Sequence, residues 1–397
     1  LATKLIQNIP KIEILYIAGL YHDIGKGRGS DHSDLGKSIA GKFCSKHKFK
    51  QEDKEIVEWL VVNHLLMSVK SQKEDLSDPN VISQFAKKVK TKERLDYLYC
   101  LTVADVSATN PNLWNSWNSS LLSELYNKTL EYLNNKDSVI LSPEENKTMA
   151  LNLLAENKKI DISKVKKAWK NFYSDYFESF NFRDLALHAK DQKNFNNESL
   201  VKIIKKDPDT LSTIMVCTKD RANVFATIIG ILDSENINFL DAKLFGMKNG
   251  FCLDFITISN QAGEVISENS SAAKSLTIRL KEALDREVLS PKIVKRRQPK
   301  HLKHFNTDTI IEYKHDMTHR WTEIDIRTAD RPGLLASICQ VFLDHGALIR
   351  KARIATYGER AEDKFCITSK ENTPYLKKRA LEVLIDDMSV SLSGLNK

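Results

Sequence analysis

A segment of this 397-residue chain recurs 110 positions later, and this repeat constrains the fold more than any other feature. Asp220–Phe225 (DRANVF) aligns with Asp330–Leu335 (DRPGLL), and the alignment continues to place Phe255 on Phe365. Short apolar runs typical of strands alternate with helical runs in both copies. The repeat therefore predicts two α+β modules of roughly 75 residues each, separated by a basic, proline-containing linker.

The first copy shows the pattern of the module most clearly. Thr213–Thr218 is predicted to be a strand, and Asn223–Glu235 (NVFATIIGILDSE) a helix. Two further strands are predicted at Ile237–Phe245 and Phe251–Ser259.

Residues 1–205 differ, because their apolar residues recur at helical spacing in IEILYIAGLYHD, EIVEWLVVNHLLM and ERLDYLYCLTVADVSA. Gly25 and Gly27 predict the end of the first of these helices, and Pro79 and Pro111 mark helix starts or breaks. We therefore expect this part of the chain to be helical.

Composition limits the class of protein. Charged residues make up 28% and hydrophobic residues 42%, as in soluble globular domains, and the net charge of +8 is mild. Such a charge favours an acidic protein partner or a phosphorylated substrate without demanding nucleic acid. The six cysteines are scattered, and no apolar run is long enough to cross a bilayer. We expect a cytoplasmic protein with no membrane or nucleic-acid partner, and a fragment of a longer one, because the chain begins with Leu1.

His22 and Asp23 stand together where the first long helix is expected to end. Imidazole and carboxylate are both ligands for a divalent metal that activates water. The simpler alternative is a histidine that caps the helix C-terminus, where a cation is favoured. Polar residues on otherwise apolar helices favour a shared polar centre, because burying them unsatisfied costs free energy. The additional candidates are His32, His64 and Asp105.

The turn between strand and helix is a second candidate site. In the second copy, Gly333 permits close backbone approach, and the free N–H groups of the helix N-terminus suit a ligand carboxylate. A turn of this kind needs a glycine and an Asp cap in any case, so spacing alone favours neither interpretation. The first copy has Ala222 and Asn223 there, and we expect Asn223 to keep the turn because Asn tolerates the left-handed conformation.

Several stretches, taken in order, resemble one known family. HDIGKGRGSDHSDLG, NHLLMSV, LTVADVSATNPNLWNSWNSSLL and KRRQPKHLKHF resemble the bifunctional uridylyltransferase/uridylyl-removing enzymes that modify the PII nitrogen regulator. The HD pair with a distant Asp is similar to the HD superfamily of metal-dependent phosphohydrolases, and the two repeats resemble ACT domains. The resemblance implies a multidomain protein, with an all-α HD-type domain followed by tandem α+β ACT domains of βαββαβ, ferredoxin-like order.

The change from helical spacing to alternating strands and helices after residue 205, together with the resemblance, predicts the domain boundaries. We expect an HD domain at residues 1–125, a helical connector at 126–205, a first ACT domain at 208–290, a basic linker at 291–318 and a second ACT domain at 319–397. The nucleotidyltransferase domain of the family, which uses UTP to uridylylate PII, is absent from this sequence.

The resemblance also implies an activity and its residues. The HD domain would hydrolyse the phosphodiester that joins UMP to a PII tyrosine, with Mg²⁺ or Mn²⁺ as cofactor. The implied metal ligands are His22, Asp23, His32, His64 and Asp105, and the implied catalytic residues are Asp23 and Lys26, whose ammonium would meet a phosphate oxygen as a point charge. The implied effector is glutamine, bound by Asp330, Arg331, Pro332, Gly333 and Leu334, with Asp220 and Asn223 in the first copy.

Two alternatives stay open at this point. The family motif begins with another histidine on an earlier helix, and no histidine precedes His22 here. This departure permits a regulatory amino-acid-binding module with an incomplete metal site. The residues also permit another HD-type enzyme that hydrolyses nucleotides.

Overall fold

The computed structural model describes residues 1–27, 32–74, 76, 78–109, 114–134, 142–157, 160–191, 198–204, 211–286, 309–331, 333–357, 360–371, 373–375 and 377–393. The contacts of the chain divide it into two units, Leu1–Ser142 and Pro143–Lys397.

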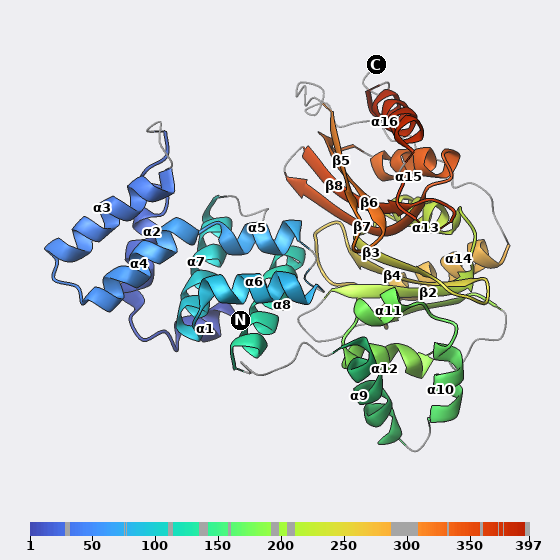
Figure 1. Ribbon diagram of the computed structural model, residues 1–397, viewed down its shortest axis with the longest axis horizontal. Helices are drawn as coiled ribbons and strands as arrows, with labels where there is room; N and C mark the ends of the chain where they lie inside the picture. Colours follow the sequence, from blue (N-terminus) through green and yellow to red (C-terminus); the bar gives the residue numbers. More distant parts are fainter. Residues whose placement is uncertain are drawn as a thin grey trace. The chain divides into compact units, whose positions relative to one another are not determined.

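The first unit is helical, as the apolar spacing predicts (Figure 1). Its helices are α1 (Ala2–Ile6), α2 (Ile12–Tyr21), α3 (His32–Lys46), α4 (Gln51–Asn63), α5 (Leu66–Lys73), α6 (Pro79–Val89), α7 (Lys92–Thr109) and α8 (Ser116–Asn134). Fully buried Ile14, Leu60 and Leu98 belong to one hydrophobic core. This core packs α2, α4 and α7 against one another.

The predicted helix boundaries in this unit hold where they can be checked. Pro79 begins α6, because its fixed φ and missing N–H suit the first helical turn. The side chain of Asp78 caps that helix by accepting a hydrogen bond from the backbone N–H of Asn80 at 2.8 Å. Gly27, with φ of 78°, lies in the turn after α2. Pro111 lies outside the described residues.

The second unit begins with helices and continues into a β-sheet (Figure 1). The helices are α9 (Pro143–Ala155), α10 (Ile162–Trp169), α11 (Ser174–Glu178) and α12 (Phe182–Asp191). The first α+β module follows as β1 (Leu200–Ile204), β2 (Ser212–Lys219), α13 (Val224–Ser234), β3 (Asn238–Gly246), β4 (Phe251–Ser259) and α14 (Ser271–Asp285). The second comprises β5 (Ile310–Asp316), β6 (Trp321–Ala329), α15 (Leu334–Asp344), β7 (Leu348–Tyr357), β8 (Arg360–Thr368) and α16 (Lys378–Ser393).

The two modules share one antiparallel sheet, in the order β1-β2-β4-β3-β7-β8-β6-β5. Strands β3 and β7 join them, with Ala242 directly opposite Ala352. These two alanines are equivalent residues of the repeat. An approximate twofold axis therefore passes between β3 and β7 and relates one module to the other.

Helices cover both faces of the sheet, which explains why β4 is apolar along nearly its whole length (Figure 1). Ile256 and Ile258 face the core that contains α13 and α14. Leu253 and Phe255 face the core that contains α9–α12. On that second face the rings of Phe255 and Phe180 lie 4.8 Å apart.

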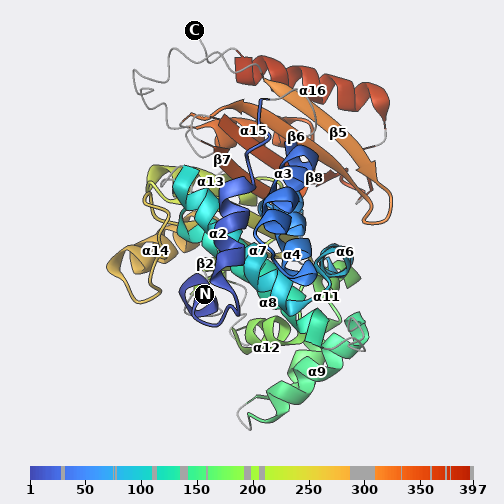
Figure 2. The same cartoon turned by 90° about the vertical axis from the view of Figure 1, so that its left-hand side faces the viewer.

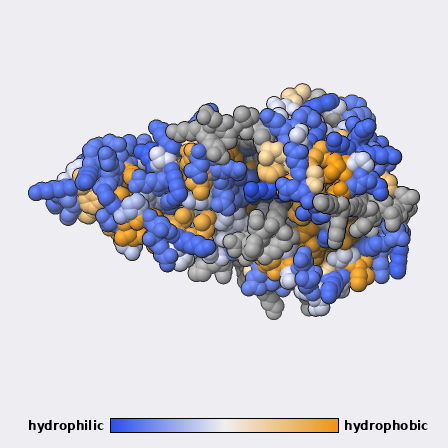
Figure 3. Space-filling model, turned by 90° about the horizontal axis from the view of Figure 1, so that it is seen from below, coloured by the Kyte–Doolittle hydropathy of each residue, from blue (hydrophilic) through white to orange (hydrophobic). Residues whose placement is uncertain are grey.

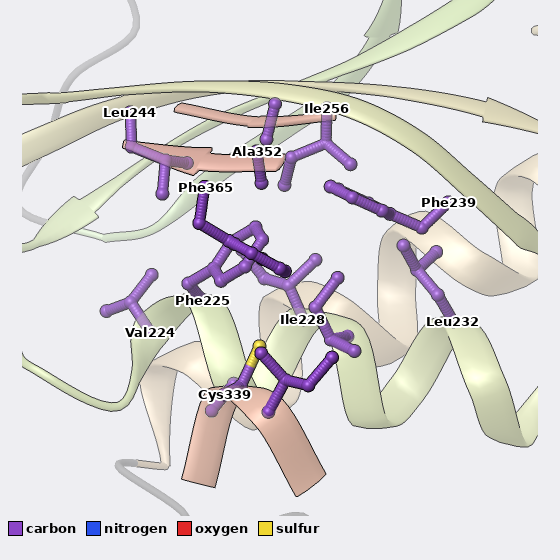
Figure 4. Packing of buried hydrophobic residues seen from close by; sticks show 14 of the residues in the cluster. Val224, Phe225, Ile228, Leu232, Phe239, Leu244, Ile256, Cys339, Ala352 and Phe365 are labelled. Carbon is purple, nitrogen blue, oxygen red and sulfur yellow. The ribbon is translucent and has the colours of Figure 1, made fainter. Parts of the chain in front are cut away.

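The hydrophobic core on the α13 side is continuous between the modules. Figure 4 shows Ile228 of α13 packed among residues of the second module, including Cys339 of α15 and Phe365 of β8. The side chain of Phe365 is 0% exposed. In the second module, Leu384 and Met388 of α16 join the same core beside the outer strands (Figure 2).

The register of the sheet corrects the repeat alignment at its end. Ala242 pairs with Ile256, and its equivalent Ala352 pairs with Phe365. Phe365 is therefore the equivalent of Ile256, and the predicted match of Phe255 to Phe365 is wrong by one residue. Ile256 follows Ala242 by 14 positions, whereas Phe365 follows Ala352 by 13, so the offset drops from 110 to 109 in the last strand.

The expected strand order and boundaries are also corrected. Each module reads ββαββα, so a strand precedes β2 and β6 at the sheet edge instead of following the last helix, as βαββαβ would require. The connector predicted at 126–205 overlaps β1, and the linker predicted at 291–318 overlaps β5. The expected domain end at residue 125 lies inside α8. The edge strand β1 was missed because its five residues lie in a lysine-rich segment, although Val201 and Ile203 alternate as buried residues.

The surface seen in Figure 3 is mainly hydrophilic, with separate hydrophobic patches. Among the described residues, no helix combines the length and the hydropathy that a transmembrane span requires.

Asp254 is one of the carboxylates buried in the sheet. Asp254 of β4 is 3% exposed and lies between Cys252 and Ile256 on the face covered by α13. Its Oδ1 atom is buried and has no hydrogen-bond partner among the described residues. Burial, with a smaller effect of the Asp220 carboxylate, raises the pKa of Asp254 to about 8. The same group ionises at about pH 4 in an unfolded chain, so the folded state binds more protons between these values and stability falls as pH rises.

Asp254→Asn removes this ionisable group while keeping its volume. We expect the variant to melt at nearly the same temperature as the original chain at about pH 4 and several degrees higher at about pH 8, because the penalty removed is at most about 5 kcal/mol. Thermal melts at both pH values measure the effect, with Asp386→Asn, at an exposed position of α16, as control. An equal effect of Asp254→Asn at both pH values would contradict the assignment.

Candidate metal centre and candidate ligand site

His22 is the C-cap residue of α2, and a hydrogen bond fixes its ring. Its Nδ1 lies 2.7 Å from the backbone oxygen of Gly19. A carbonyl oxygen only accepts, so Nδ1 carries the hydrogen and Nε2 is the atom directed at the neighbouring carboxylates. The capping role and the ligand role considered for this histidine are therefore compatible, because each uses a different ring nitrogen.

His64 repeats this arrangement at the end of α4. Its Nδ1 lies 2.7 Å from the backbone oxygen of Val61, and its side chain is 1% exposed. The rings of His22 and His64 lie 5.1 Å apart, at 68° to each other. Two helices thus end at the same place, each presenting one imidazole Nε2.

Two carboxylates complete the centre. Nε2 of His22 lies 3.3 Å from Oδ2 of Asp23 and 3.4 Å from Oδ1 of Asp105. Nε2 of His64 lies 3.6 Å from Oδ1 of Asp23. That Asp23 oxygen is buried and has no hydrogen-bond partner among the described residues. Four of the five candidate ligands from the sequence therefore lie close together, and their role as metal ligands stays a prediction.

The pKa values reflect this arrangement. The hydrogen bond to Asp105 is the main cause that raises the pKa of His22, and the same bond lowers the pKa of Asp105. Burial lowers the pKa of His64, which favours its neutral form. Of the two imidazoles, His22 is therefore the easier to protonate and His64 the harder.

These side chains fit a divalent metal by their chemistry. Imidazole nitrogen and carboxylate oxygen are ligand types that such ions take, and each histidine has the outer hydrogen bond that metal-bound histidines have. Among the described residues, no three His, Cys, Asp or Glu side chains already stand in the geometry of a metal site. The nitrogen and oxygen atoms instead pair with one another, and a metal would replace these pairings.

The other predicted residues of this centre have different positions. Lys26 is 62% exposed, and its Nζ pairs with Oδ2 of Asp23 at 2.5 Å. His32 begins α3, but its side chain lies outside the described residues. Sequence reasoning did not identify Gly36, whose lack of a side chain lets α3 approach the end of α2: a Cβ there would lie 3.3 Å from the Tyr21 carbonyl oxygen.

In the second module, the turn has the predicted glycine conformation. Gly333 has φ of 77° and is the N-cap residue of α15. Arg331 and Leu334 beside it are buried, and burial raises the pKa of Asp330. Pro332 lies outside the described residues.

The first module departs from the expected turn. Asn223 has φ of −93° and ψ of 0°, so it does not adopt the left-handed conformation expected from the alignment. The helix α13 starts there without a side-chain cap, and α15 also has none. Asp220 lines a cavity beside the turn.

Comparisons with known proteins agree with the site and extend over the whole chain. The HD domain family model matches residues 1–110, which include all four converging residues. A protein from Pseudomonas putida (strain W619) is 40% identical over 383 residues, covering 94% of this chain and 42% of the relative. A Pseudomonas fluorescens protein is 38% identical over 404 residues, covering 98% and 45%. An Idiomarina loihiensis protein is 36% identical over 386 residues, covering 96% and 44%.

All three relatives are bifunctional uridylyltransferase/uridylyl-removing enzymes. This chain is homologous to these enzymes over nearly all of its length. It spans less than half the length of the relatives it matches. A crystal structure of an unknown protein from Galdieria sulphuraria matches 46% of this chain and 91% of that one at 12% identity, with a TM-score of 0.15 that is too low to support an argument about the fold.

We expect Mn²⁺ to bind the centre and to stabilise the chain. At a hundred times its Kd the metal should add about 2–3 kcal/mol to the free energy of unfolding. His22→Gln and Asp105→Asn should lose most of this gain, whereas His47→Ala, at an exposed position just after α3, should keep it. Thermal melts with and without Mn²⁺ provide the measurement. A full Mn²⁺ effect in both site variants would show that the metal binds elsewhere.

Proposed function

We propose that this chain removes UMP from uridylylated PII by metal-dependent hydrolysis of a phosphodiester. The observation that supports this most directly is the convergence of His22, Asp23, His64 and Asp105 within the HD-matching residues. The relatives, which are named for uridylyl removal, supply the substrate class. We further propose that the longer protein also uridylylates PII from UTP; the relatives are named as uridylyltransferases as well as uridylyl-removing enzymes.

The four converging residues would hold Mg²⁺ or Mn²⁺, and His32 would complete the set. A bound divalent ion would lower the pKa of a water molecule and neutralise charge on the phosphoryl oxygens. The backbone bonds of Gly19 and Val61 would keep the two histidine rings oriented towards the carboxylates while a metal replaces the present pairings.

Asp23 and Lys26 are the proposed catalytic residues beside the metal ligands. The ammonium of Lys26 is exposed, and among the described residues its contact with Asp23 holds it near the centre. The phosphate of an incoming substrate would compete with Asp23 for the Lys26 ammonium, which acts as a point charge. Transfer of Lys26 from Asp23 to the phosphate would leave the carboxylate free to accept a proton from the attacking water.

We propose that glutamine controls this activity through the two modules, acting as ACT domains. The support is structural and chemical: Gly333 adopts the left-handed conformation that opens the N-terminus of α15. The residues proposed to contact the ligand are Asp330, Arg331, Gly333 and Leu334 with Pro332, and Asp220 and Asn223 in the first module.

Release of UMP from uridylylated PII tests the proposed hydrolysis. We expect release by this chain with Mn²⁺, and a loss of more than about 100-fold in the rate of release for Asp23→Ala and Asp105→Ala. Mutating even the outer-shell partners of metal ligands typically lowers metal affinity or activity about 10- to 100-fold. Lys26→Ala should be slower while retaining Mn²⁺, and His47→Ala should be unaffected.

The same assay distinguishes UMP removal from PII from the alternative function, hydrolysis of free nucleotides. Free nucleotides should be poor substrates when offered in place of modified PII. Efficient hydrolysis of free nucleotides, with modified PII left intact, would reassign the centre to a nucleotide phosphohydrolase.

A further inference from the structure

Asp105 differs from the two histidines of the candidate metal centre in how its side chain is held. His22 and His64 are each fixed by a backbone oxygen of their own helix, three residues earlier. Asp105 is fixed by a side chain, because Oγ1 of Thr109, the last residue of α7, donates a hydrogen bond to its Oδ1 at 3.3 Å. All three candidate ligands therefore have an outer partner nearby in the sequence.

The hydrogen bond of Thr109 differs from those of other helical threonines in this chain. A threonine hydroxyl inside a helix commonly donates to the backbone oxygen four residues earlier. Four threonines of the described helices do so, at 2.6 to 2.9 Å: Thr102, Thr129, Thr148 and Thr277. Thr109 instead donates to the side-chain carboxylate of the residue four positions earlier. Its hydroxyl therefore acts on a candidate metal ligand and not on the helix backbone.

The same oxygen of Asp105 also faces the imidazole of His22, with Nε2 at 3.4 Å. Binding of a divalent ion by His22 would end this pairing, because Nε2 is the atom directed at the carboxylate. The Thr109 hydroxyl would remain as a partner of Asp105. The carboxylate needs one, because the terminal torsion of an aspartate has no sharp preference of its own. The side chain is also 21% exposed, so water could otherwise take the place of a fixed donor.

We propose that Thr109 is a positioning residue that keeps the carboxylate of Asp105 oriented to bind the divalent metal. The inference rests on the proposed metal-dependent function and adds to it a residue outside the predicted ligand set. Hydrogen bonds from outer partners orient ligating carboxylates as they orient ligating histidines. Thr109 thus serves Asp105 as the carbonyl groups of Gly19 and Val61 serve the two histidines.

Two substitutions isolate the hydroxyl of Thr109. Thr109→Val keeps the branched shape of the side chain and removes the donor, whereas Thr109→Ser keeps the donor and removes a methyl group. The residue is exposed at the end of α7, where substitutions usually change stability little. Both variants are therefore expected to fold, and metal-free melting curves check this.

Calorimetric titration of the whole chain with Mn²⁺ tests the inference. We expect Thr109→Val to weaken Mn²⁺ binding about tenfold, at the lower end of the effect of losing an outer partner of a metal ligand. Thr109→Ser should bind Mn²⁺ as the original chain does. Thr148→Val is the matched control, because it loses a hydroxyl that donates to a backbone oxygen in α9, and it should leave Mn²⁺ binding unchanged.

The Mn²⁺ dependence of UMP release distinguishes positioning from catalysis. Thr109→Val should need about tenfold more Mn²⁺ for half-maximal release. It should reach nearly the original rate at saturating Mn²⁺, because a positioning residue contacts neither the attacking water nor the phosphate. A rate that stays low at saturating Mn²⁺, with unchanged Mn²⁺ affinity, would show that the hydroxyl acts on the substrate and would overturn the inference.

The titration also separates this inference from the proposed function. Unchanged Mn²⁺ affinity in Thr109→Val, with binding lost in Asp105→Asn, would overturn the positioning role and leave the metal centre standing. Equal weakening by Thr109→Val and Thr109→Ser would also overturn it, because the hydroxyl would then not be the group that matters. Absence of Mn²⁺ binding by the original chain would overturn the proposed metal centre together with the inference.

Discussion

The candidate metal centre depends on two hydrogen bonds between an imidazole Nδ1 and a backbone carbonyl. His22 and His64 each end a helix, and each donates to the carbonyl three residues earlier. Carbonyls in the last turn of a helix have no helical partner, so a histidine at that position satisfies one of them. The same bond determines which ring nitrogen faces the carboxylates. A local need of the helix end and the orientation of a ligand are thus met by one interaction.

The packing of three helices then brings these ends together. The buried core of α2, α4 and α7 is apolar, and the polar residues lie where the helices end or, for Asp105, near the end of α7. This explains why the sequence predicted His22, Asp23, His64 and Asp105: each is a polar residue next to an apolar helical run. It could not predict the roles of Gly19, Val61 or Gly36, because backbone carbonyls and close helix contacts leave no pattern in side-chain chemistry.

The repeat predicted the two modules but gave little information about the residues that meet between them. Equal spacing predicted the strands and helices of both copies, but a one-residue difference after β7 misplaced the last strand and concealed the correspondence between Asp254 and Asp363. Arg350 is 130 positions from Asp220 in sequence. Only the pairing of β3 with β7 brings it to the first module, and alternation within a strand cannot reveal a partner across a module boundary.

The two copies pair through the equivalent strands β3 and β7, so residues of each copy pack against the other. Had the modules stayed symmetric, both turns would face the same residue, and two equal sites would be expected. Among the differences between the copies, Arg350 of β7 has Leu240 of β3 as its equivalent. The shared core, with Phe365 and Ile228 in contact across the modules, makes the two copies one folding unit.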